Sequence, residues 1–131
     1  RKENFLYKHI INQVRQFIKG EIQQIVIGDL YAETDWGYAG DYVRALHHIN
    51  QLSLAGDFVV ASGQAHRVID WFLVLEKHTG INFRSAIVED SKRLGRKKPT
   101  LIGNNFKILQ TGWKPEVSFE QMVIHIYDDL L

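Results

Sequence analysis

The sequence predicts a small mixed α/β unit, and two observations support this fold class. Segments in which apolar residues recur every three or four positions, as on one face of a helix, alternate with short β-branched runs that are typical of strands. The chain has 131 residues, of which 45% are hydrophobic. This is enough for one core and too few for two full domains, so we expect a single domain over residues 1–131.

Four segments have helical spacing, and most of them carry a signal at one end. The helices are expected at Asn4 to Lys19, Asp41 to Leu54, Arg67 to His78 and Ser118 to Leu130. Gly20 and Gly80 suit the left-handed residue that commonly ends a helix. Asp41 is expected as the N-cap of the second helix, and Ser118 with Gln121 three residues later forms a capping box before the fourth.

Short strands are expected between the helices. They are Ile22 to Ile27, Phe58 to Ala61 and Phe83 to Val88. Asp29 to Gly40 and Glu89 to Pro99 are rich in polar residues or lack periodicity, so irregular loops are expected there. A short helix, capped by Asn104 or Asn105, is expected to reach Thr111.

Composition excludes several functions for the molecule as a whole. The formal net charge is +1, so no general affinity for a polyanion or an anionic membrane is expected. No apolar run reaches the roughly 20 residues of a membrane-spanning helix. The absence of cysteine excludes disulfides and is typical of a reducing compartment, so a cytoplasmic location is expected. The six histidines lack the spacing of a zinc site, and no metal is expected.

One long run carries most of the functional information. It extends from Gly28 to Ala45 and reads Gly-Asp-Leu-Tyr-Ala-Glu-Thr-Asp-Trp-Gly-Tyr-Ala-Gly-Asp-Tyr-Val-Arg-Ala. Glu3-Asn4-Phe5 precedes it, and Asp57 to Gly63, His66 and Gly112-Trp113-Lys114-Pro115 follow in order. Together these segments resemble the GDP-mannose 4,6-dehydratases, in which the run is Gly-Asn-Leu-Asp-Ala-x-Arg-Asp-Trp-Gly-His-Ala-x-Asp-Tyr-Val-x-Ala. The resemblance covers nearly the whole chain.

This resemblance implies a place among the extended short-chain dehydrogenases. In these enzymes an N-terminal Rossmann domain binds NADP or NAD, and a smaller C-terminal domain binds the sugar nucleotide. The family's glycine-rich turn and Tyr-x-x-x-Lys pair precede the helix that begins here at Asn4, and neither motif occurs in this sequence. We therefore expect a small mixed α/β C-terminal domain with no catalytic residue and no cofactor of its own, inactive when alone.

The resemblance also implies substrate-binding residues at the start of the first helix. Phe5, Leu6 and Lys8 lie on the turns that line the nucleotide in the family, and Lys8 keeps the charge of the family's arginine. A solvated lysine on an amphipathic helix is an equally good interpretation of Lys8. Phe5 is expected in the core in either case.

A second group of implied contacts lies in the long run. Thr34 stands where the family has an arginine that binds the diphosphate, and Trp36 follows two residues later. Threonine cannot offer the two-pronged contact of a guanidinium. The competing interpretation is that Asp35 caps a turn and Trp36 packs in the core.

A cationic cluster falls near the family's other diphosphate arginine. It comprises Lys92, Arg93, Arg96, Lys97 and Lys98, ahead of Pro99, Leu101 and Gly103, which keep the rest of the family's pattern. Arg93, one residue out of register, and Arg96 are the candidates, and Lys97 replaces a glutamate that holds the ribose. Such a cluster also suits a solvated loop or nucleic acid, although no aromatic residues are interleaved to stack on bases.

The expected function is sugar-nucleotide binding in an enzyme that converts GDP-mannose to GDP-4-keto-6-deoxymannose in deoxysugar biosynthesis. An NDP-sugar epimerase or reductase of the same family is one alternative, because Thr34 and Lys97 depart from the family's contacts. A non-catalytic binding or dimerisation module is another. Cut away from a larger sheet, the Phe58 to Ala61 strand would expose an edge, so a homo-oligomer is expected.

Overall fold

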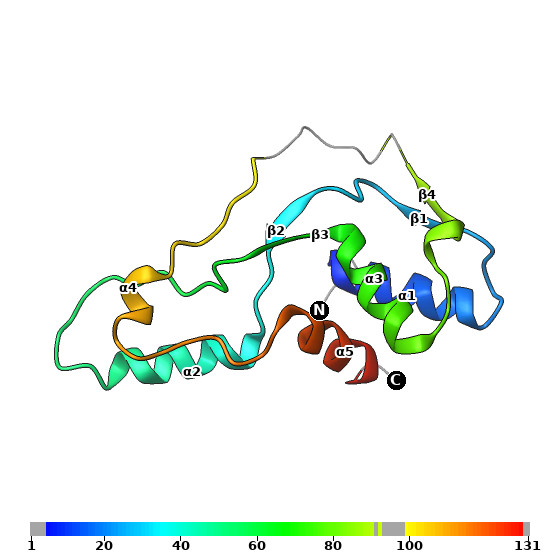
Figure 1. The fold of residues 1–131 in the computed structure, drawn as a ribbon. Helices are drawn as coiled ribbons and strands as arrows, with labels where there is room; N and C mark the ends of the chain where they lie inside the picture. The colour runs from blue at the N-terminus through cyan, green and yellow to red at the C-terminus, as the bar shows by residue number, and fades with distance from the viewer. Residues whose placement is uncertain (1–4, 91, 93–98, 130–131) are drawn as a thin grey trace.

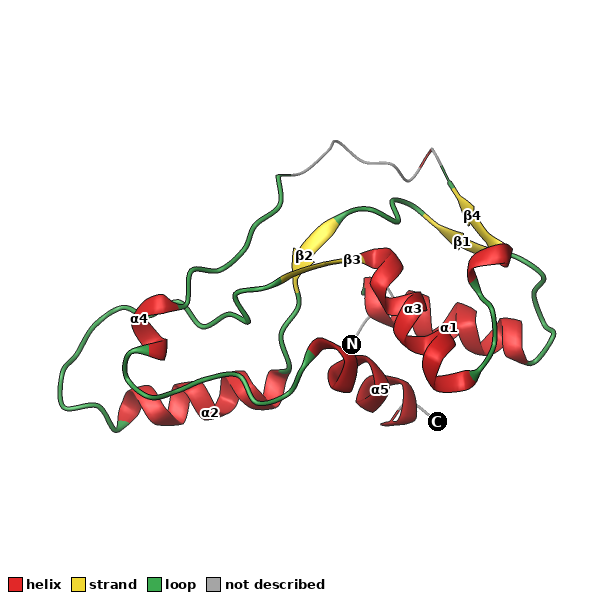
Figure 2. Ribbon diagram, in the orientation of Figure 1, coloured by secondary structure: helices red, strands yellow, loops and turns green. Residues whose placement is uncertain are grey.

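A computed structural model describes residues 5–90, 92 and 99–129 of the protein. The α-helices in these ranges are α1 (Leu6–Ile18), α2 (Ala39–Asn50), α3 (Val68–Thr79), α4 (Phe106–Leu109) and α5 (Phe119–Asp129). The strands are β1 (Ile25–Ile27), β2 (Glu33–Asp35), β3 (Ala65–Arg67) and β4 (Ile87–Glu89), and a 3-10 turn, η1 (Arg84–Ala86), precedes β4. This order confirms the mixed α/β prediction (Figures 1 and 2).

The described residues form two cores at opposite ends of the molecule. Figure 1 shows α1, α3 and α5 gathered at one end with β1 and β4, and α2 with α4 at the other. The larger core consists of Ile10, Ile11, Val14, Ile25, Ile27, Val68, Trp71, Phe72, Leu75, Phe83, Met122 and Val123. The smaller core consists of Ala45, Ile108 and Trp113, with Ile49, Phe58 and Val60 packed against them. The strand pair β2 and β3 lies between the two ends (Figure 2).

The apolar face of α1 joins this helix to β1. Ile10, Ile11 and Val14 are fully buried, which is the spacing that predicted the helix. Gln13 lies among them, and its amide pairs with the backbone of Val26: Oε1 accepts from the N–H and Nε2 donates to the carbonyl, each at 2.8 Å. Because β4 pairs in parallel with β1, the Gln13 amide occupies the edge of β1 that β4 leaves free.

Strands β2 and β3 pair antiparallel, in the register Glu33 with Arg67, Thr34 with His66 and Asp35 with Ala65. The expectation of an irregular chain from Asp29 to Gly40 is therefore wrong at β2. This strand has no alternating pattern, and its partner lies some 30 residues further along the chain, so only the tertiary pairing reveals it.

Helix α2 differs from its predicted form at both ends. It begins at Ala39 with Tyr38 as the N-cap, and its C-cap is Gln51, so Asp41 is not the N-cap and the helix does not reach Leu54. Asp41 lies in the first turn and is 1% exposed. Its carboxylate accepts hydrogen bonds from another segment, residues 116–117, instead of capping its own helix.

The predicted strand from Phe58 to Ala61 is also wrong. Residues 55–64 form no strand ladder within the described parts of the chain. Phe58 and Val60 nevertheless pack on the smaller core, while Val59 between them is exposed, which is the alternation of an extended segment. The segment has the pattern of a strand and no neighbouring strand to pair with.

The remaining boundaries follow the predictions more closely. Gly20 and Gly80 adopt φ values of 73° and 72° just after their helices, as left-handed caps do. The capping box of α5 is present: Ser118 Oγ accepts from the Gln121 N–H at 3.2 Å, and Gln121 Oε1 accepts from the Ser118 N–H at 2.9 Å. Only part of the predicted Phe83 to Val88 strand is extended, because η1 precedes β4. Of the predicted loop after Glu89, residues 91 and 93–98 lie outside the described residues.

Candidate functional site

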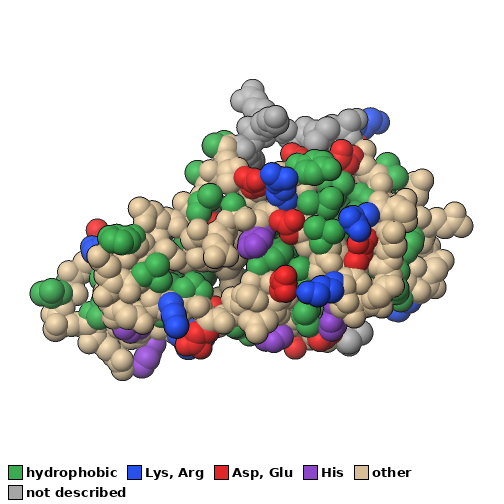
Figure 3. All heavy atoms as spheres, viewed as in Figure 1, with side chains coloured by type: hydrophobic (Ala, Val, Ile, Leu, Met, Phe, Trp, Pro, Cys, Tyr) green, Lys and Arg blue, Asp and Glu red, His purple; other side chains and the backbone are tan. Residues whose placement is uncertain are grey.

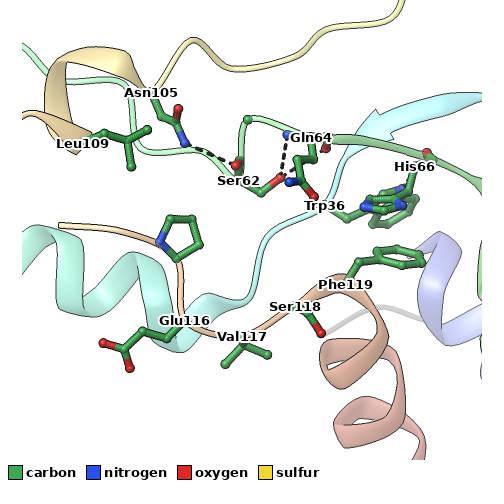
Figure 4. Close-up of a pocket in the computed structure, with 12 residues that line it drawn as sticks. Trp36, Ser62, Gln64, His66, Asn105, Leu109, Glu116, Val117, Ser118 and Phe119 are labelled. Carbon is green, nitrogen blue, oxygen red and sulfur yellow. Dashed lines mark hydrogen bonds between the residues drawn. The ribbon is translucent and has the colours of Figure 1, made fainter.

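A cleft separates the two parts of the molecule. One wall is formed by residues 62–64 and His66, the other by residues 115–119, and the volume between them is about 490 Å³. Figure 3 shows the surface hollowed between the two parts, and Figure 4 shows the side chains that line the cleft. This volume lies within the range of small-molecule sites, roughly 300–1,000 Å³. The cleft is therefore the candidate functional site.

Asp35 fixes one wall of the cleft. Its Oδ1 accepts from the N–H and the hydroxyl of Ser62, at 3.1 and 2.5 Å. Its Oδ2 accepts from the N–H groups of Gly63 and Gly103, each at 3.0 Å. A Cβ on Gly103 would lie 2.1 Å from the Cβ of Ala61, so this close approach requires glycine. Asp35 thus accepts backbone N–H groups, as a capping carboxylate does, but they belong to distant segments and not to a turn that it begins.

Asp41 fixes the opposite wall. Its Oδ2 accepts from the N–H groups of Glu116 and Val117, at 3.1 and 3.0 Å, and its Oδ1 lies 2.8 Å from Arg44 Nη2. A buried carboxylate requires such partners, since an unpaired buried charge is strongly unfavourable. Two aspartates of the Gly28 to Ala45 run thus hold the two walls.

Tyr42 lies behind the first wall. A Cβ on Gly37 would lie 1.8 Å from the Tyr42 hydroxyl oxygen, so the tyrosine ring closes over this glycine. Burial raises the pKa of the Tyr42 hydroxyl, and the nearby Asp35 carboxylate raises it further. The phenol therefore stays neutral beside Asp35 and does not compete with it as an anion.

Aromatic rings close one end of the cleft. The Trp36 ring meets Trp71 edge to face, with centroids 5.2 Å apart, and its Nε1 donates to the His66 carbonyl at 3.3 Å. The His66 ring is stacked on Phe119, with centroids 3.9 Å apart and planes 8° apart. His66 Nδ1 lies 3.9 Å from the Asp70 carboxylate. Trp36 packs against the larger core, as one interpretation predicted, and also lines the cleft.

Amide side chains and aliphatic groups line the rest of the cleft. Asn105 Nδ2 donates to the carbonyls of Ala61 and Ser62, at 3.0 and 3.2 Å. Gln64 extends toward the cleft, where Leu109 also contributes to the lining (Figure 4). The lining thus combines apolar surface with groups that both donate and accept hydrogen bonds.

The residues predicted at the start of α1 do not line the cleft. Phe5 is the N-cap of α1 and is 47% exposed, so the prediction that it lies in the core is wrong. Phe5 precedes the helix and does not share the buried face of Ile10 and Val14. Its ring lies beside the Tyr7 ring, with the two centroids 6.1 Å apart. Leu6 is also exposed, and Lys8 is half-buried.

Thr34 is exposed at the centre of β2. It lies directly opposite His66, and opposite residues of an antiparallel pair project from the same face. Glu33 projects from the other face, where it pairs with Arg67 at 3.1 Å and accepts from the Thr100 hydroxyl at 3.2 Å. Among the predicted site residues that the structure describes, Trp36 alone lines the cleft. Arg93 and Arg96 lie outside the described residues.

Sequence reasoning missed most of the lining. Gln64, Asn105 and Phe119 belong to segments far apart in the chain, and no motif links them. The signal that could have found the site is Asp35, because a carboxylate expected to cap a turn implies a specific backbone partner.

The described residues contain neither a metal cluster nor a membrane-spanning helix. No group of three or more His, Asp or Glu side chains there could hold a metal ion. None of the helices in that part of the chain has the length and apolarity needed to cross a bilayer. A dinucleotide needs a parallel strand leading through a glycine-rich turn into a helix, whereas β1, which pairs in parallel with β4, leads into β2. β1 and the residues that follow it therefore lack that arrangement.

Solved structures define the class of this fold. RMD from Pseudomonas aeruginosa complexed with NADPH superposes with a TM-score of 0.82 at 23% identity, covering 98% of this chain and 43% of that one. The dTDP-glucose 4,6-dehydratase of Bacillus anthracis, solved with NAD, gives a TM-score of 0.76 at 14% identity, covering 99% and 40%. The fold is that of part of an extended short-chain dehydrogenase, the class of nucleotide-sugar dehydratases and epimerases.

Sequence comparison identifies the family. The family model of GDP-mannose 4,6 dehydratase matches residues 1–126. GDP-mannose 4,6 dehydratase 1 of Arabidopsis thaliana is 33% identical over 132 residues, and the match covers 98% of this chain and 36% of the relative. The Homo sapiens enzyme is 30% identical over an alignment of 146 positions, which covers 94% of this chain and 38% of the relative. The chain belongs to the GDP-mannose 4,6-dehydratase family and spans little more than a third of the length of these relatives.

Proposed function

We propose that this chain is the sugar-nucleotide-binding part of a nucleotide-sugar 4,6-dehydratase that acts on a GDP-linked sugar. The observation that carries the proposal is the family match over residues 1–126. Since the chain spans 36% of the Arabidopsis relative, the rest of such an enzyme would supply the chemistry. Family members are nucleotide-sugar dehydratases, and this chain alone is proposed to be inactive.

The cofactor would be bound elsewhere in the parent enzyme. The described residues provide no strand, turn and helix suited to NADP or NAD, so no redox step is assigned to them. The part played by this chain is then to hold and orient the substrate. The proposed contacts are Phe5, Leu6, Lys8, Thr34, Trp36, Arg93 and Arg96.

Exposed apolar residues near the smaller core support the idea that a further domain covers it. Val43 and Leu46 of α2 are 65% and 60% exposed. Val59 and Phe106, which belong to the segments that supply Phe58 and Ile108 to the smaller core, are exposed as well. Such surfaces commonly mark contacts between domains or subunits. We propose that the catalytic domain covers them in the parent enzyme. Pairing with a second copy is the alternative, and it would account for the expected homo-oligomer.

Calorimetric titration with GDP-mannose, UDP-glucose, dTDP-glucose and a single-stranded oligonucleotide tests the binding proposal. We expect GDP-mannose to bind, and we expect Thr34→Arg to strengthen its binding roughly tenfold or more, because a guanidinium adds charge-assisted bonds to the diphosphate. Gln24→Arg is the matched control, since it adds the same charge at another exposed position just before β1.

Three outcomes would contradict the proposal. The first is equal gains from Thr34→Arg and Gln24→Arg, which would indicate general charge attraction. The second is preference for the oligonucleotide over every nucleotide sugar. The third is turnover of GDP-mannose by the purified chain, which would contradict its inactivity.

A further inference from the structure

His66 is the one side chain among the described lining residues of the cleft that can become positively charged. The lining contains no lysine or arginine, and its one carboxylate is already paired: Glu116 Oε2 lies 3.3 Å from Arg44 Nη2. The His66 side chain is 27% exposed, so solvent and ligands reach it. Histidine is the side chain whose charge ordinarily changes between about pH 5 and pH 8. Any positive charge in the lining therefore depends on pH, through His66.

Two neighbours hold the His66 ring in place and are compatible with a positive charge on it. The ring is stacked on Phe119 of α5, with centroids 3.9 Å apart, and the face of an aromatic ring attracts a cation (Figure 4). The Asp70 carboxylate of α3 lies 3.9 Å from His66 Nδ1, which is close enough to balance the charge of an imidazolium. Asp70 Oδ2 also accepts from the Arg67 N–H at 2.7 Å, and this hydrogen bond fixes the carboxylate.

The remaining neighbours of His66 are neutral or face elsewhere. From β2, Thr34 lies directly opposite, and Trp36 Nε1 donates to the His66 carbonyl at 3.3 Å. Arg67, the next residue of β3, projects from the other face of the strand pair, where its Nε lies 3.1 Å from Glu33 Oε1. Within the described residues the imidazole makes no hydrogen bond, so Nε2 is available to a ligand.

The register of β2 and β3 places this imidazole beside one of the proposed substrate contacts. Thr34 and His66 are paired residues on one face, and the Cβ atoms of such a pair are roughly 4.5–5.5 Å apart. An oxygen that accepts a hydrogen bond from the Thr34 hydroxyl is therefore within reach of the His66 ring. Threonine supplies no charge to a phosphate, whereas an imidazolium supplies a charge-assisted hydrogen bond.

From this arrangement we infer that His66, in its protonated form, binds a diphosphate oxygen of the substrate beside Thr34, so that affinity for the sugar nucleotide rises as the pH falls. The inference rests on the proposed function, which assigns Thr34 to the substrate. Asp70 is a positioning residue, because it acts on the ligand through the imidazole. The charge beside Thr34 is then switched by pH and is not permanent, as the charge of an arginine would be.

Calorimetric titration of the chain with GDP-mannose at several pH values between about 5.5 and 8.5 tests the inference. GDP-mannose is the probe because its diphosphate is esterified at both ends and keeps its charge over this range, whereas a terminal phosphate titrates near pH 6. We expect binding to be roughly tenfold tighter at the lowest pH than at the highest. His66→Gln should remove this dependence, and Asp70→Asn should reduce it. His47→Gln, the same change at an exposed histidine of α2, is the matched control and should keep it.

A second variant separates the charge of His66 from its packing. His66→Phe keeps a ring to stack on Phe119 and removes the charge, so it should show the same flat pH profile as His66→Gln. Binding of GDP-mannose that is equally tight at every pH, or a pH profile that is the same in the parent chain and in His66→Phe, would overturn the inference and leave the proposed function standing. Absence of GDP-mannose binding at every pH would overturn both.

Discussion

At the scale of single residues, the run that carries the family resemblance serves mainly to build the protein. Asp35 and Asp41 hold opposite walls of the cleft by accepting backbone N–H groups from other segments. Gly37 makes room for the ring of Tyr42. Matching residues in such a run are therefore strong indicators of fold, while contacts with ligand must be argued for each side chain separately.

Asp35 provides a direct test of this structural role. Both of its oxygens accept two hydrogen bonds, so an amide in their place would turn an NH₂ group toward N–H donors. We expect Asp35→Asn to lower the free energy of unfolding by about 2–3 kcal/mol, measured by urea denaturation. Asp57→Asn makes the same change at an exposed aspartate and should stay within about 0.5 kcal/mol. Equal losses in the two variants would contradict the role of Asp35.

Tyr42 predicts how stability depends on pH. Its pKa is raised in the folded protein, mainly by burial and then by Asp35, whereas an unfolded tyrosine ionises near pH 10, by its reference pKa. The unfolded state therefore loses its proton first, and the free energy of unfolding should fall as pH rises above about 10 and be unaffected by this group below it. Tyr42→Phe should flatten that fall in urea denaturation between about pH 8 and pH 11. An identical slope in the variant would show that Tyr42 is not responsible.

At the scale of elements, the sequence predicts what depends on neighbouring residues. The stripe of Ile10, Ile11 and Val14 predicted α1, and the Ser118 and Gln121 pair predicted the start of α5. Both signals are contained within a single helix. β2 could not be predicted in this way, because its three residues become a strand only through pairing with β3.

The failed strand from Phe58 to Ala61 has the opposite cause. Its alternation is present, with Phe58 and Val60 inward and Val59 outward, but a strand also needs a partner. The cleft could not be predicted either, because its walls come from residues 62–66 and 115–119, and their approach depends on Asp35 and Asp41. Local periodicity contains no information on which carboxylate accepts from which distant backbone group.

At the scale of the whole molecule, the two cores differ greatly in size. Trp71, Phe72 and Phe83 are fully buried in the larger core, whereas Ala45 and Ile108 are the fully buried members of the smaller one. Local stability follows the extent of buried apolar contact. We therefore expect the amide protons of α2 to exchange faster than those of α1 and α3, measured by native-state hydrogen exchange.

A pair of core variants turns this expectation into a test of how the parts depend on each other. Ile108→Ala should remove about 2–5 kcal/mol from the smaller core and abolish protection in α2, while α1 keeps most of its protection. Leu75→Ala, at an equally buried site of the larger core, should lower protection in every helix. The reason is that the hydrogen bonds of Asp35 and Asp41 connect the smaller part to the larger core, so destabilising the larger core also destabilises the smaller one.

If the catalytic domain covers Val43 and Leu46, joining it to this chain should slow exchange in α2 more than in α1. Uniform protection across α1, α2 and α3, lost together in both variants, would instead mean that the two cores unfold as one cooperative unit.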